Sequence, residues 1–345
     1  MGQVSRPATS AATDAGVLVV DVVVVGAGPA GLSAALNLVR ARRTVLLIDA
    51  NRPRNAATLQ SHGFLTRDGI SPLELRKLGR AEVEAYPEAT VVQAVVDEVV
   101  PEGAGWRVHA TGRGTAVSAT ARAVVVATGL REEFPSLPSL RAFYGTSVHS
   151  CVECDGYEKA GEALAFVCET PDVVDRALYL AAWTDDLVVY TNGAPTLDEA
   201  GRERLAAAGI RVDERPVADL EGDRSGMTGV RLEDGHVEPR TGGFVRPTWH
   251  VDLDWLRADV ERDAEGLLVV DASGRTAVPG LYAVGDVTPP GPEQLIVAAG
   301  HGARTASAVH RDLVGGLRDV RDAVQWLIVP RATGTRGRTA SWGMV

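Results

Sequence analysis

Continuous apolar runs mark the strands that the beginning of the chain predicts. Val22 to Val25 form such a run at the end of a nine-residue apolar stretch, Val17 to Val25. Leu32 to Arg42 follows with helical character, and Thr44 to Ile48 is a second strand-like run that ends at Asp49. Strands of a parallel sheet are buried on both faces and are therefore continuously apolar rather than alternating. The pattern predicts a strand–helix–strand unit with parallel strands.

The same kind of pattern recurs further along the chain. Ala123 to Val126 and Leu281 to Val284 are short apolar runs that predict two more buried strands. Between them, Ala163 to Val167 predicts a strand, Val173 to Trp183 a helix, and Leu187 to Tyr190 a strand. These three elements form a second βαβ unit. The chain is therefore expected to begin one domain, insert another, and return to the first.

The predicted fold is α/β, with two Rossmann-like domains of three-layer ββα form. Residues 18–129 and 247–317 make up the first domain, and residues 130–246 the smaller inserted one. Residues 1–17 are small and polar and predict a disordered tail, and residues 318–345 form a C-terminal extension.

Composition narrows the class of protein. The 345 residues carry 35 basic and 45 acidic side chains, a net charge of −10, which argues against a nucleic-acid partner. The chain is 45% hydrophobic and 23% charged, as globular proteins are. Three cysteines are too few for a disulfide-stapled secreted scaffold. The first apolar run contains Asp21 and is too short for a membrane span or a signal peptide. A cytoplasmic protein without a membrane partner is expected.

A glycine-rich turn carries the strongest chemical signal. Gly26, Gly28 and Gly31 stand in the pattern G-x-G-x-x-G between the first strand and its helix, and Asp49 ends the next strand. Gly26 permits the tight turn, Gly28 lets the backbone approach a pyrophosphate, and Gly31 allows close helix–strand packing. The helix N-terminus favours phosphates, and Asp49 would bind ribose hydroxyls. The turn predicts a dinucleotide site; the alternative is a glycine turn without a ligand.

A second element indicates FAD rather than NAD. The strand from Leu281 ends in Gly285-Asp286, which can place a carboxylate and backbone amides on the ribityl and pyrophosphate part of a flavin dinucleotide. Ala298 to Gly302 then begins another helix. A nicotinamide site does not need this element, whose alternative interpretation is a simple turn.

Cys151 and Cys154 form a C-x-x-C pair followed by Asp155. Two sulfurs at this spacing can close a small disulfide ring and lower the pKa of one thiol. A zinc site would need further ligands, but the only other cysteine, Cys168, lies in an apolar strand and is expected to be an inert core thiol. We therefore favour a redox-active pair over a zinc site and over two cysteines without a role. No metal site is predicted.

Two neighbours of the pair are candidate catalytic groups. Asp155 is a candidate proton donor or acceptor for the dithiol, or else a solvated turn residue. His149 can stabilise a thiolate, or else is a packed or exposed histidine. Glu153 lies between the sulfurs, where its charge opposes thiolate formation, and the sequence gives no reason for its presence.

With these signals in order, residues 18–317 resemble the thioredoxin-reductase-like flavoproteins. The resemblance implies an FAD domain interrupted by a pyridine-nucleotide domain that carries the C-x-x-C, and a homodimer. It implies that Cys154 exchanges electrons with the flavin, that Cys151 reacts with the substrate sulfur, and that Asp155 is the acid/base. Glu293 to Leu295 falls where the family has a flavin-contacting turn. The residues expected to bind FAD are Gly26, Gly28, Pro29, Ala30, Gly31, Asp49, Ala50, Asn55, His62, Ala127, Thr128, Gly129, Gly285, Asp286, Gln294 and Leu295.

One branch of these flavoproteins is more similar. Pro53 to Ala56, His62 to Gly69, Gly156 to Glu158 and Trp183 to Leu187 resemble segments of the dithiol oxidases of the holomycin and gliotoxin type. Those enzymes close a disulfide in a small natural product, and oxygen reoxidises their flavin to give hydrogen peroxide. That branch usually has histidine at the position of Asp155, where thioredoxin reductases have aspartate.

The inserted domain lacks a nucleotide fingerprint of its own. The strand Ala163–Val167 is followed by Cys168 to Val174, without a glycine, and Glu169 and Asp172 add negative charge where phosphates would bind. The segment directly after Tyr190, Thr191 to Pro195, contains no arginine that could hold a 2′-phosphate. Inefficient use of NADPH is therefore expected, against the alternative of a degenerate but functional site.

Three functions follow from these observations. The preferred one is a dithiol oxidase that passes electrons from a small-molecule dithiol through Cys151 and Cys154 to FAD and O2. The second is a thioredoxin-type disulfide reductase that uses NADPH or another electron donor. The third is a non-catalytic flavoprotein, which the intact C-x-x-C disfavours.

Overall fold

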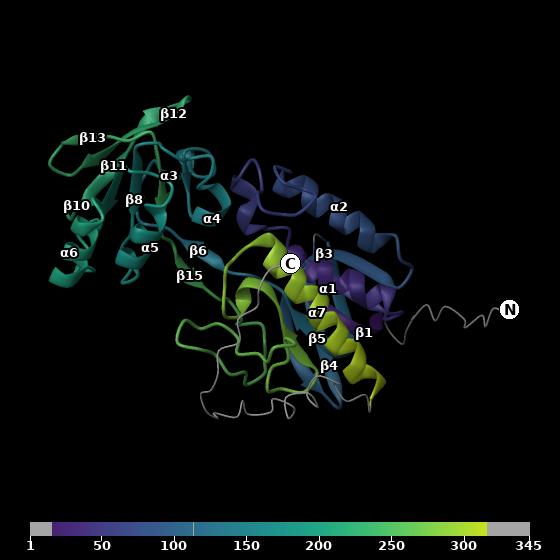
Figure 1. The fold of residues 1–345 in the computed structure, drawn as a ribbon. Helices are drawn as coiled ribbons and strands as arrows, with labels where there is room; N and C mark the ends of the chain where they lie inside the picture. Colours follow the sequence, from purple (N-terminus) through teal and green to yellow (C-terminus); the bar gives the residue numbers. More distant parts are fainter. Residues whose placement is uncertain (1–15, 113, 316–345) are drawn as a thin grey trace, which may run out of the picture.

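The computed structural model describes residues 16–112 and 114–315, which form a larger and a smaller lobe (Figure 1). The predictions for the N-terminal tail and the C-terminal extension lie almost wholly outside these residues. The first strand already begins at Val17. The larger lobe contains β1 (Val17–Val25), α1 (Pro29–Arg40), β2 (Val45–Asp49), the 3₁₀ turn η1 (Arg54–Ala57), α2 (Pro72–Glu84), β3 (Ala89–Glu102), β4 (Gly105–Gly112), β5 (Thr115–Val126), β16 (Leu281–Ala283), η2 (Gly285–Val287) and α7 (Leu295–Val314).

The sheet of the larger lobe brings together segments that are far apart in sequence. Strand β1 pairs in parallel with β2 on one side and with β5 on the other, and β16 adds to β5, also in parallel. Strand β3 continues the sheet beyond β2 and turns back through β4 to β5 in antiparallel pairing. Because the parallel strands run the same way, their carboxyl ends meet on one side of the sheet. Gly26, Asp49, Ala127 and Gly285 all lie at or just after these strand ends.

Both faces of this sheet are covered. Helices α1 and α7 pack on one face, where Leu38, Val39 and Val309 are fully buried with Val22 and Val24 of β1. Val23 and Val25 point into a second cluster, formed with β3, β4 and the chain after β15. Burying each such valine contributes roughly 1.5–3 kcal/mol of transfer free energy, which explains the continuous apolar run in the sequence.

The smaller lobe repeats the plan of helices on one face and a small sheet on the other. Its five parallel strands run in the order β10-β9-β8-β14-β7, with α5 and α6 in one core cluster and the β11–β13 sheet in another. Its elements are α3 (Leu140–Phe143), β7 (Val148–His149), α4 (Val152–Asp155), β8 (Leu164–Val167), α5 (Val173–Leu180), β9 (Leu187–Tyr190), α6 (Glu199–Ala207), β10 (Arg211–Asp213), β11 (Val217–Asp223), β12 (Gly226–Leu232), β13 (Val237–Pro239) and β14 (Gly242–Val245). The predicted α/β class with two ββα units is confirmed.

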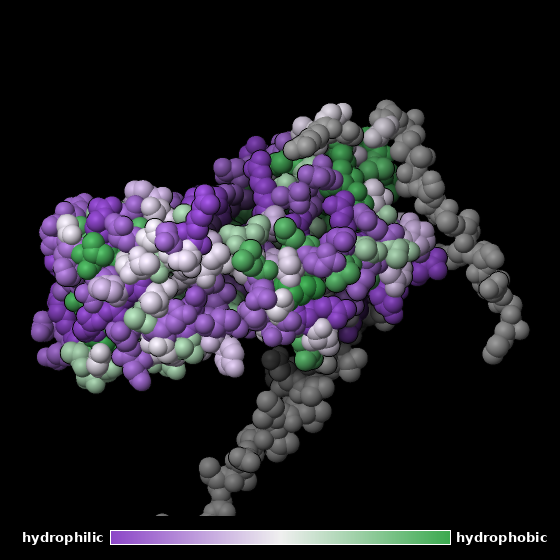
Figure 2. Space-filling model, turned by 90° about the horizontal axis from the view of Figure 1, so that it is seen from above, coloured by the Kyte–Doolittle hydropathy of each residue, from purple (hydrophilic) through white to green (hydrophobic). Residues whose placement is uncertain are grey.

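Two antiparallel strands, β6 (Arg131–Glu133) and β15 (Thr248–His250), connect the lobes. From above, the surface is mostly hydrophilic, and hydrophobic side chains gather mainly on the larger lobe (Figure 2). Every helix within the described ranges is too short or too polar to cross a membrane.

Several predicted helix ends were wrong. Helix α5 ends at Leu180 rather than Trp183. Helix α1 spans Pro29–Arg40 rather than Leu32 to Arg42. Proline is favoured in the first turn of a helix because its missing N–H needs no partner there. The last helix, α7, begins at Leu295 rather than at Ala298, so Gln294 is its N-cap residue.

Candidate active site

The first glycine turn combines two packing glycines with one that leaves space. A Cβ atom on Gly26 would lie 2.4 Å from the Ala127 carbonyl oxygen, and one on Gly31 would lie 1.9 Å from the Gly26 carbonyl oxygen. A Cβ atom on Gly28 would meet nothing within 4 Å. Gly28 is also the N-cap residue of α1, whose first N–H groups have no partner within the helix. The turn therefore leaves an open cradle at a helix N-terminus, which suits a phosphate group.

One cavity runs along the edge of the sheet beside this turn. Most of the residues predicted to bind FAD line it: Gly26, Gly28, Pro29, Ala30, Asp49, Asn55, Ala127, Thr128, Gly129, Gly285, Asp286 and Leu295. These residues come from both ends of the sequence, as a flavin dinucleotide stretched across the strand ends would require. The donor set fits FAD, with backbone N–H groups for the pyrophosphate and Asp49 and Asp286 for hydroxyl groups.

Four predicted residues lie elsewhere. Gly31 is buried in the packing between α1 and the turn. Ala50 lines a neighbouring cavity that shares Gly26 and Asp49 with the first. Gln294 and His62 line the cavity beside the cysteines.

Three arginines in the first cavity were not predicted: Arg52, Arg54 and Arg76. Arg76 donates to Asp49 at 2.8 Å, and Arg54 donates to Asp286 at 2.8 Å. Both acids that the sequence assigns to cofactor hydroxyls are thus held by a cation. Because Arg54 and Asp286 are 232 residues apart, sequence spacing gives no signal for this pair.

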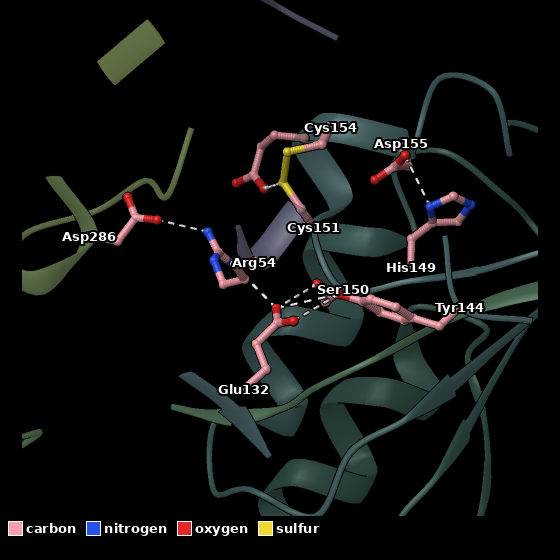
Figure 3. The surroundings of a disulfide bond; sticks show 10 residues. Arg54, Glu132, Tyr144, His149, Ser150, Cys151, Cys154, Asp155 and Asp286 are labelled. Carbon is pink, nitrogen blue, oxygen red and sulfur yellow. Dashed lines mark hydrogen bonds and ion pairs between the residues drawn. A yellow bond between two sulfur atoms is a disulfide. The ribbon is translucent and has the colours of Figure 1, made fainter. Parts of the chain in front are cut away.

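The second cavity contains the two cysteines. Cys151 and Cys154 are joined by a disulfide at the start of the single-turn helix α4 (Figure 3). Arg54, Asn55 and Leu295 line both this cavity and the first one. The disulfide therefore lies next to the dinucleotide cavity, as electron transfer between a cysteine pair and a flavin would require.

Asp155 and His149 lie together on the buried side of α4. His149 Nδ1 is 3.0 Å from Asp155 Oδ1, and the two side chains are only 8% and 12% exposed. His149 Nε2 lies 3.1 Å from the Thr146 carbonyl oxygen, which can only accept, so Nε2 carries a proton. Both residues line the cavity of the cysteines, so the interpretation of His149 as an unrelated packed histidine is not favoured.

A buried acid, Glu132, joins the two lobes below the disulfide (Figure 3). Its carboxylate accepts from Arg54 at 3.2 Å, from Ser150 Oγ at 3.2 Å and from the Tyr144 hydroxyl at 3.1 Å. Burial and the Glu132 charge raise the pKa of Tyr144, so the hydroxyl stays protonated. The side chain of Glu132 is only 7% exposed and was not predicted. It fixes Arg54 between the two cavities.

Two further residues border the cavity of the cysteines. His62 lies 3.5 Å from Glu158 and 3.6 Å from Asp68, so its nearest charged neighbours are acids of the chain. Glu293 precedes the N-cap of α7, and burial, followed by the charge of Asp286, raises its pKa. The turn Glu293 to Leu295 thus faces both cavities, as the predicted flavin-contacting turn would.

The corresponding turn in the smaller lobe is built differently. Strand β8 ends at Val167, and Cys168, Thr170 and Asp172 fill the connection to α5. Cys168 is fully buried and its Sγ lies 3.3 Å from the Thr170 hydroxyl; burial raises its pKa, which agrees with an inert thiol. Side chains of the chain itself thus occupy the position of the fingerprint glycines.

The structure corrects the prediction of excess negative charge at this second turn. The sequence predicted that Asp172 would leave excess negative charge at the helix N-terminus. In the structure, Asp172 pairs with Arg176 and with Arg246, whose Nε lies 3.1 Å away. Burial opposes ionisation of Asp172, but the hydrogen bonds from Thr170 and Arg176 and the charge of Arg246 hold its pKa below the usual value. The charge is neutralised locally, and Asp172 is the anion at this position.

Comparison with known proteins agrees with this arrangement. A family model described as pyridine nucleotide-disulphide oxidoreductase matches residues 20–302. The chain is 38% identical to HlmI, whose crystal structure superposes with a TM-score of 0.80 over 91% of this chain and 97% of that one. It is 35% identical to the putative thioredoxin reductase TrxB of Bacillus anthracis, with a TM-score of 0.78 over 86% and 98% of the two chains.

A curated relative covers a similar span. The chain is 28% identical to a probable thioredoxin reductase of Arthroderma benhamiae, over 85% of this chain and 80% of that protein.

Among residues 16–112 and 114–315, no group of three or more histidine, cysteine, aspartate or glutamate side chains is arranged to hold a metal ion.

Proposed function

Because the chain belongs to the pyridine nucleotide-disulphide oxidoreductase family, we propose that it oxidises a small-molecule dithiol to a disulfide with O2 as the final acceptor. The predicted resemblance to thioredoxin-reductase-like flavoproteins, including the holomycin and gliotoxin branch, is confirmed by the matches above. The chain is an FAD-dependent disulfide oxidoreductase. Our proposal adds the direction of electron flow, from dithiol to flavin, and the acceptor, O2.

One observation carries the direction. The first glycine turn leaves an open cradle beside Gly28, whereas the second turn is filled by Thr170 and Asp172 and its two arginines are engaged by that carboxylate. A pyridine nucleotide would have to displace an internal ion pair there. A dithiol needs only access to Cys151, which lines an open cavity.

The residues of the chain have distinct roles in this proposal. FAD, when bound, supplies the two-electron acceptor for the cysteine pair and passes the electrons to O2, which gives H2O2. The cradle at Gly28 and the residues around Asp286 would hold it. Cys151 forms the mixed disulfide with the substrate, and Cys154 leaves as the thiolate next to the cofactor cavity. Asp155, positioned by His149, holds or releases the proton that this thiolate exchanges.

The proposal is tested by aerobic turnover. Purified holoenzyme with a panel of small dithiols should consume O2 and release one H2O2 per disulfide formed, without any pyridine nucleotide. Cys151→Ser should abolish this turnover while keeping the flavin spectrum. Oxygen uptake at the rate of free flavin, or uptake that persists in Cys151→Ser, would contradict the proposal.

A homodimer and a cytoplasmic location remain proposals. The larger lobe exposes Leu59, Leu65 and Leu73, which are 70%, 80% and 57% exposed, on and before helix α2. The homodimer is proposed from the resemblance to thioredoxin-reductase-like flavoproteins, and these leucines are candidates for its interface. Light scattering of the purified protein at micromolar concentration should give twice the mass of one chain.

A further inference from the structure

The disulfide is flanked by two carboxylates in contrasting surroundings. Asp155 is buried beside His149, whereas Glu153 is exposed on the outer side of α4. Glu153 Oε2 lies 3.9 Å from Cys151 Sγ, the sulfur that meets the substrate in the proposed function. Pairs of acids in unlike environments commonly divide the proton transfers of one reaction between them.

Glu153 lies near an aromatic pair on the neighbouring helix. Burial, followed by the charge of the Glu153 carboxylate, raises the pKa of Tyr179 on α5. Tyr179 in turn packs edge-on against Trp183, with ring centroids 5.2 Å apart. Trp183 also abuts α4, because a Cβ atom on Gly156 would lie 3.0 Å from its indole nitrogen. The Glu153 carboxylate thus lies between this aromatic pair and Cys151 Sγ, 3.9 Å from the sulfur.

The charge of Glu153 acts differently in the two directions of exchange. In a reductase, Cys151 must become a thiolate in order to attack a disulfide, and a carboxylate 3.9 Å away disfavours that thiolate. In an oxidase, Cys151 is the sulfur under attack and carries no charge. What is needed there is a base for the incoming thiol, since the thiolate is the nucleophile.

We propose that Glu153 is the base that takes the proton from the first thiol of the dithiol substrate. This inference rests on the proposed oxidase function. As the proton moves to Glu153, the substrate sulfur forms a bond to Cys151 Sγ, the Cys151–Cys154 bond breaks, and its electron pair stays on Cys154. The second substrate thiol attacks the first substrate sulfur, the bond from that sulfur to Cys151 breaks, and the proton of the second thiol passes to Cys151, which leaves as a thiol. The substrate leaves as a disulfide, oxidised by two electrons that the cysteine pair has gained, with one of its protons on Glu153 and the other on Cys151.

The first experiment measures reduction of the bound flavin by dithiothreitol, without oxygen, in a stopped-flow instrument from pH 6 to 10. Glu153→Gln should slow the reaction by roughly 10²-fold at pH 7, a typical contribution of a general base. The difference should vanish near pH 10, above the pKa of about 8.5 of a free thiol, where the thiolate forms without a base. Glu203→Gln, an equal charge change at an exposed site on α6, should match the wild type. Equal rates for Glu153→Gln and wild type at pH 7 would overturn the proposal.

The second experiment does not depend on the flavin. In Cys154→Ser, Cys151 is a free thiol and Cys168 is buried, so alkylation by iodoacetamide reports on Cys151. Adding Glu153→Gln should lower the pH midpoint of alkylation by about one unit, because a neighbouring negative charge is removed. An unchanged midpoint would overturn the role of Glu153. If instead NADPH reduces the wild-type flavin and dithiols do not, the proposed oxidase function fails. The pH midpoint of Cys151 alkylation tests the effect of Glu153 separately, because it does not depend on the flavin.

Discussion

The two strand–turn–helix units of this molecule invite comparison, because each begins a domain of the same plan. In the larger lobe the turn after β1 presents backbone and leaves the space at Gly28 open. In the smaller lobe the turn after β8 presents side chains, and Asp172 binds Arg176 and Arg246. A fold that can hold a dinucleotide is thus not enough; the turn must leave space and free donors. The difference teaches that two turns of the same plan can differ in what they present: the second carries a carboxylate of the chain itself, Asp172, at its helix N-terminus.

The largest effect is expected from filling the open cradle. Gly28→Val places a side chain where no atom of the chain lies within 4 Å, so the fold is retained while the space for a pyrophosphate is lost. We expect affinity for FAD to fall by at least about 100-fold, or roughly 3 kcal/mol, and the protein to purify nearly colourless. The ratio of flavin to protein absorbance measures this. Gly300→Val, an exposed glycine of α7 that also has open space, is the matched control and should stay yellow.

Arg54 should have the next largest effect, since it connects the cofactor cavity with the disulfide. Arg54→Met removes the partner of both Asp286 and Glu132 and leaves two partly buried carboxylates unpaired. Such losses typically cost a few kcal/mol, so we expect FAD to dissociate about 10- to 100-fold faster. Flavin fluorescence released on dilution measures the rate. Arg67→Met, at an exposed arginine whose side chain donates to the Thr66 carbonyl oxygen, should leave the rate unchanged. Equal rates in both variants would show that Arg54 does not support the cofactor.

Much of this site was readable from the sequence because it is local. The glycine turn, the C-x-x-C and the strand that leads to Gly285 are short patterns. Each one indicates a chemical role by itself, and together they indicated FAD and the redox pair. Arg54 was missed because its contacts with Glu132 and Asp286 span 78 and 232 residues. Tyr144 contacts Glu132 from only 12 residues away, but the sequence pattern does not mark that pair. The compensation of Asp172 by Arg246 was missed because 74 residues separate them.

The fold shows the same division. The buried parallel strands were predicted because they are continuously apolar, but β3 and β4 were not. Their residues alternate between buried and exposed positions and pair with each other in a long antiparallel ladder. Two helix ends were misplaced by three residues where no capping side chain marks them: the end of α5 and the start of α7.

A smaller effect is expected from releasing the internal anion of the second turn. Asp172→Asn removes the charge that Arg176 and Arg246 share, so both become available to a phosphate. We expect NADPH to bind about tenfold more tightly than to the wild type, which equals about 1.4 kcal/mol, while dithiol oxidation is unchanged. Quenching of NADPH fluorescence measures the affinity. Asp175→Asn, an exposed acid on the same helix that pairs with Arg204, is the control. No gain in Asp172→Asn would show that Asp172 does not block the site.

The smallest effect concerns His301, which accepts a hydrogen bond from the Gly285 N–H at 3.2 Å. Burial lowers the pKa of His301, so the folded protein keeps it neutral. The unfolded chain binds a proton near the usual value of about 6.5, so stability is present above that pH and is lost as pH falls through it. Between pH 7.5 and 5.5 we expect a loss of up to about 1 kcal/mol. Thermal unfolding of His301→Asn, which keeps an acceptor but does not titrate, should show less of this loss; the same pH dependence in both proteins would contradict the assignment.

The direction of electron flow is tested most directly by titrating the purified yellow protein without oxygen, first with NADPH, then with NADH, and finally with a small dithiol. The flavin absorbance band reports reduction at each stage. We predict that neither pyridine nucleotide bleaches the band at stoichiometric amounts and that the dithiol does so through Cys151 and Cys154. Prompt, stoichiometric bleaching by NADPH would contradict the account and would show that the turn from Cys168 to Val173 admits the nucleotide and that the enzyme works as a reductase.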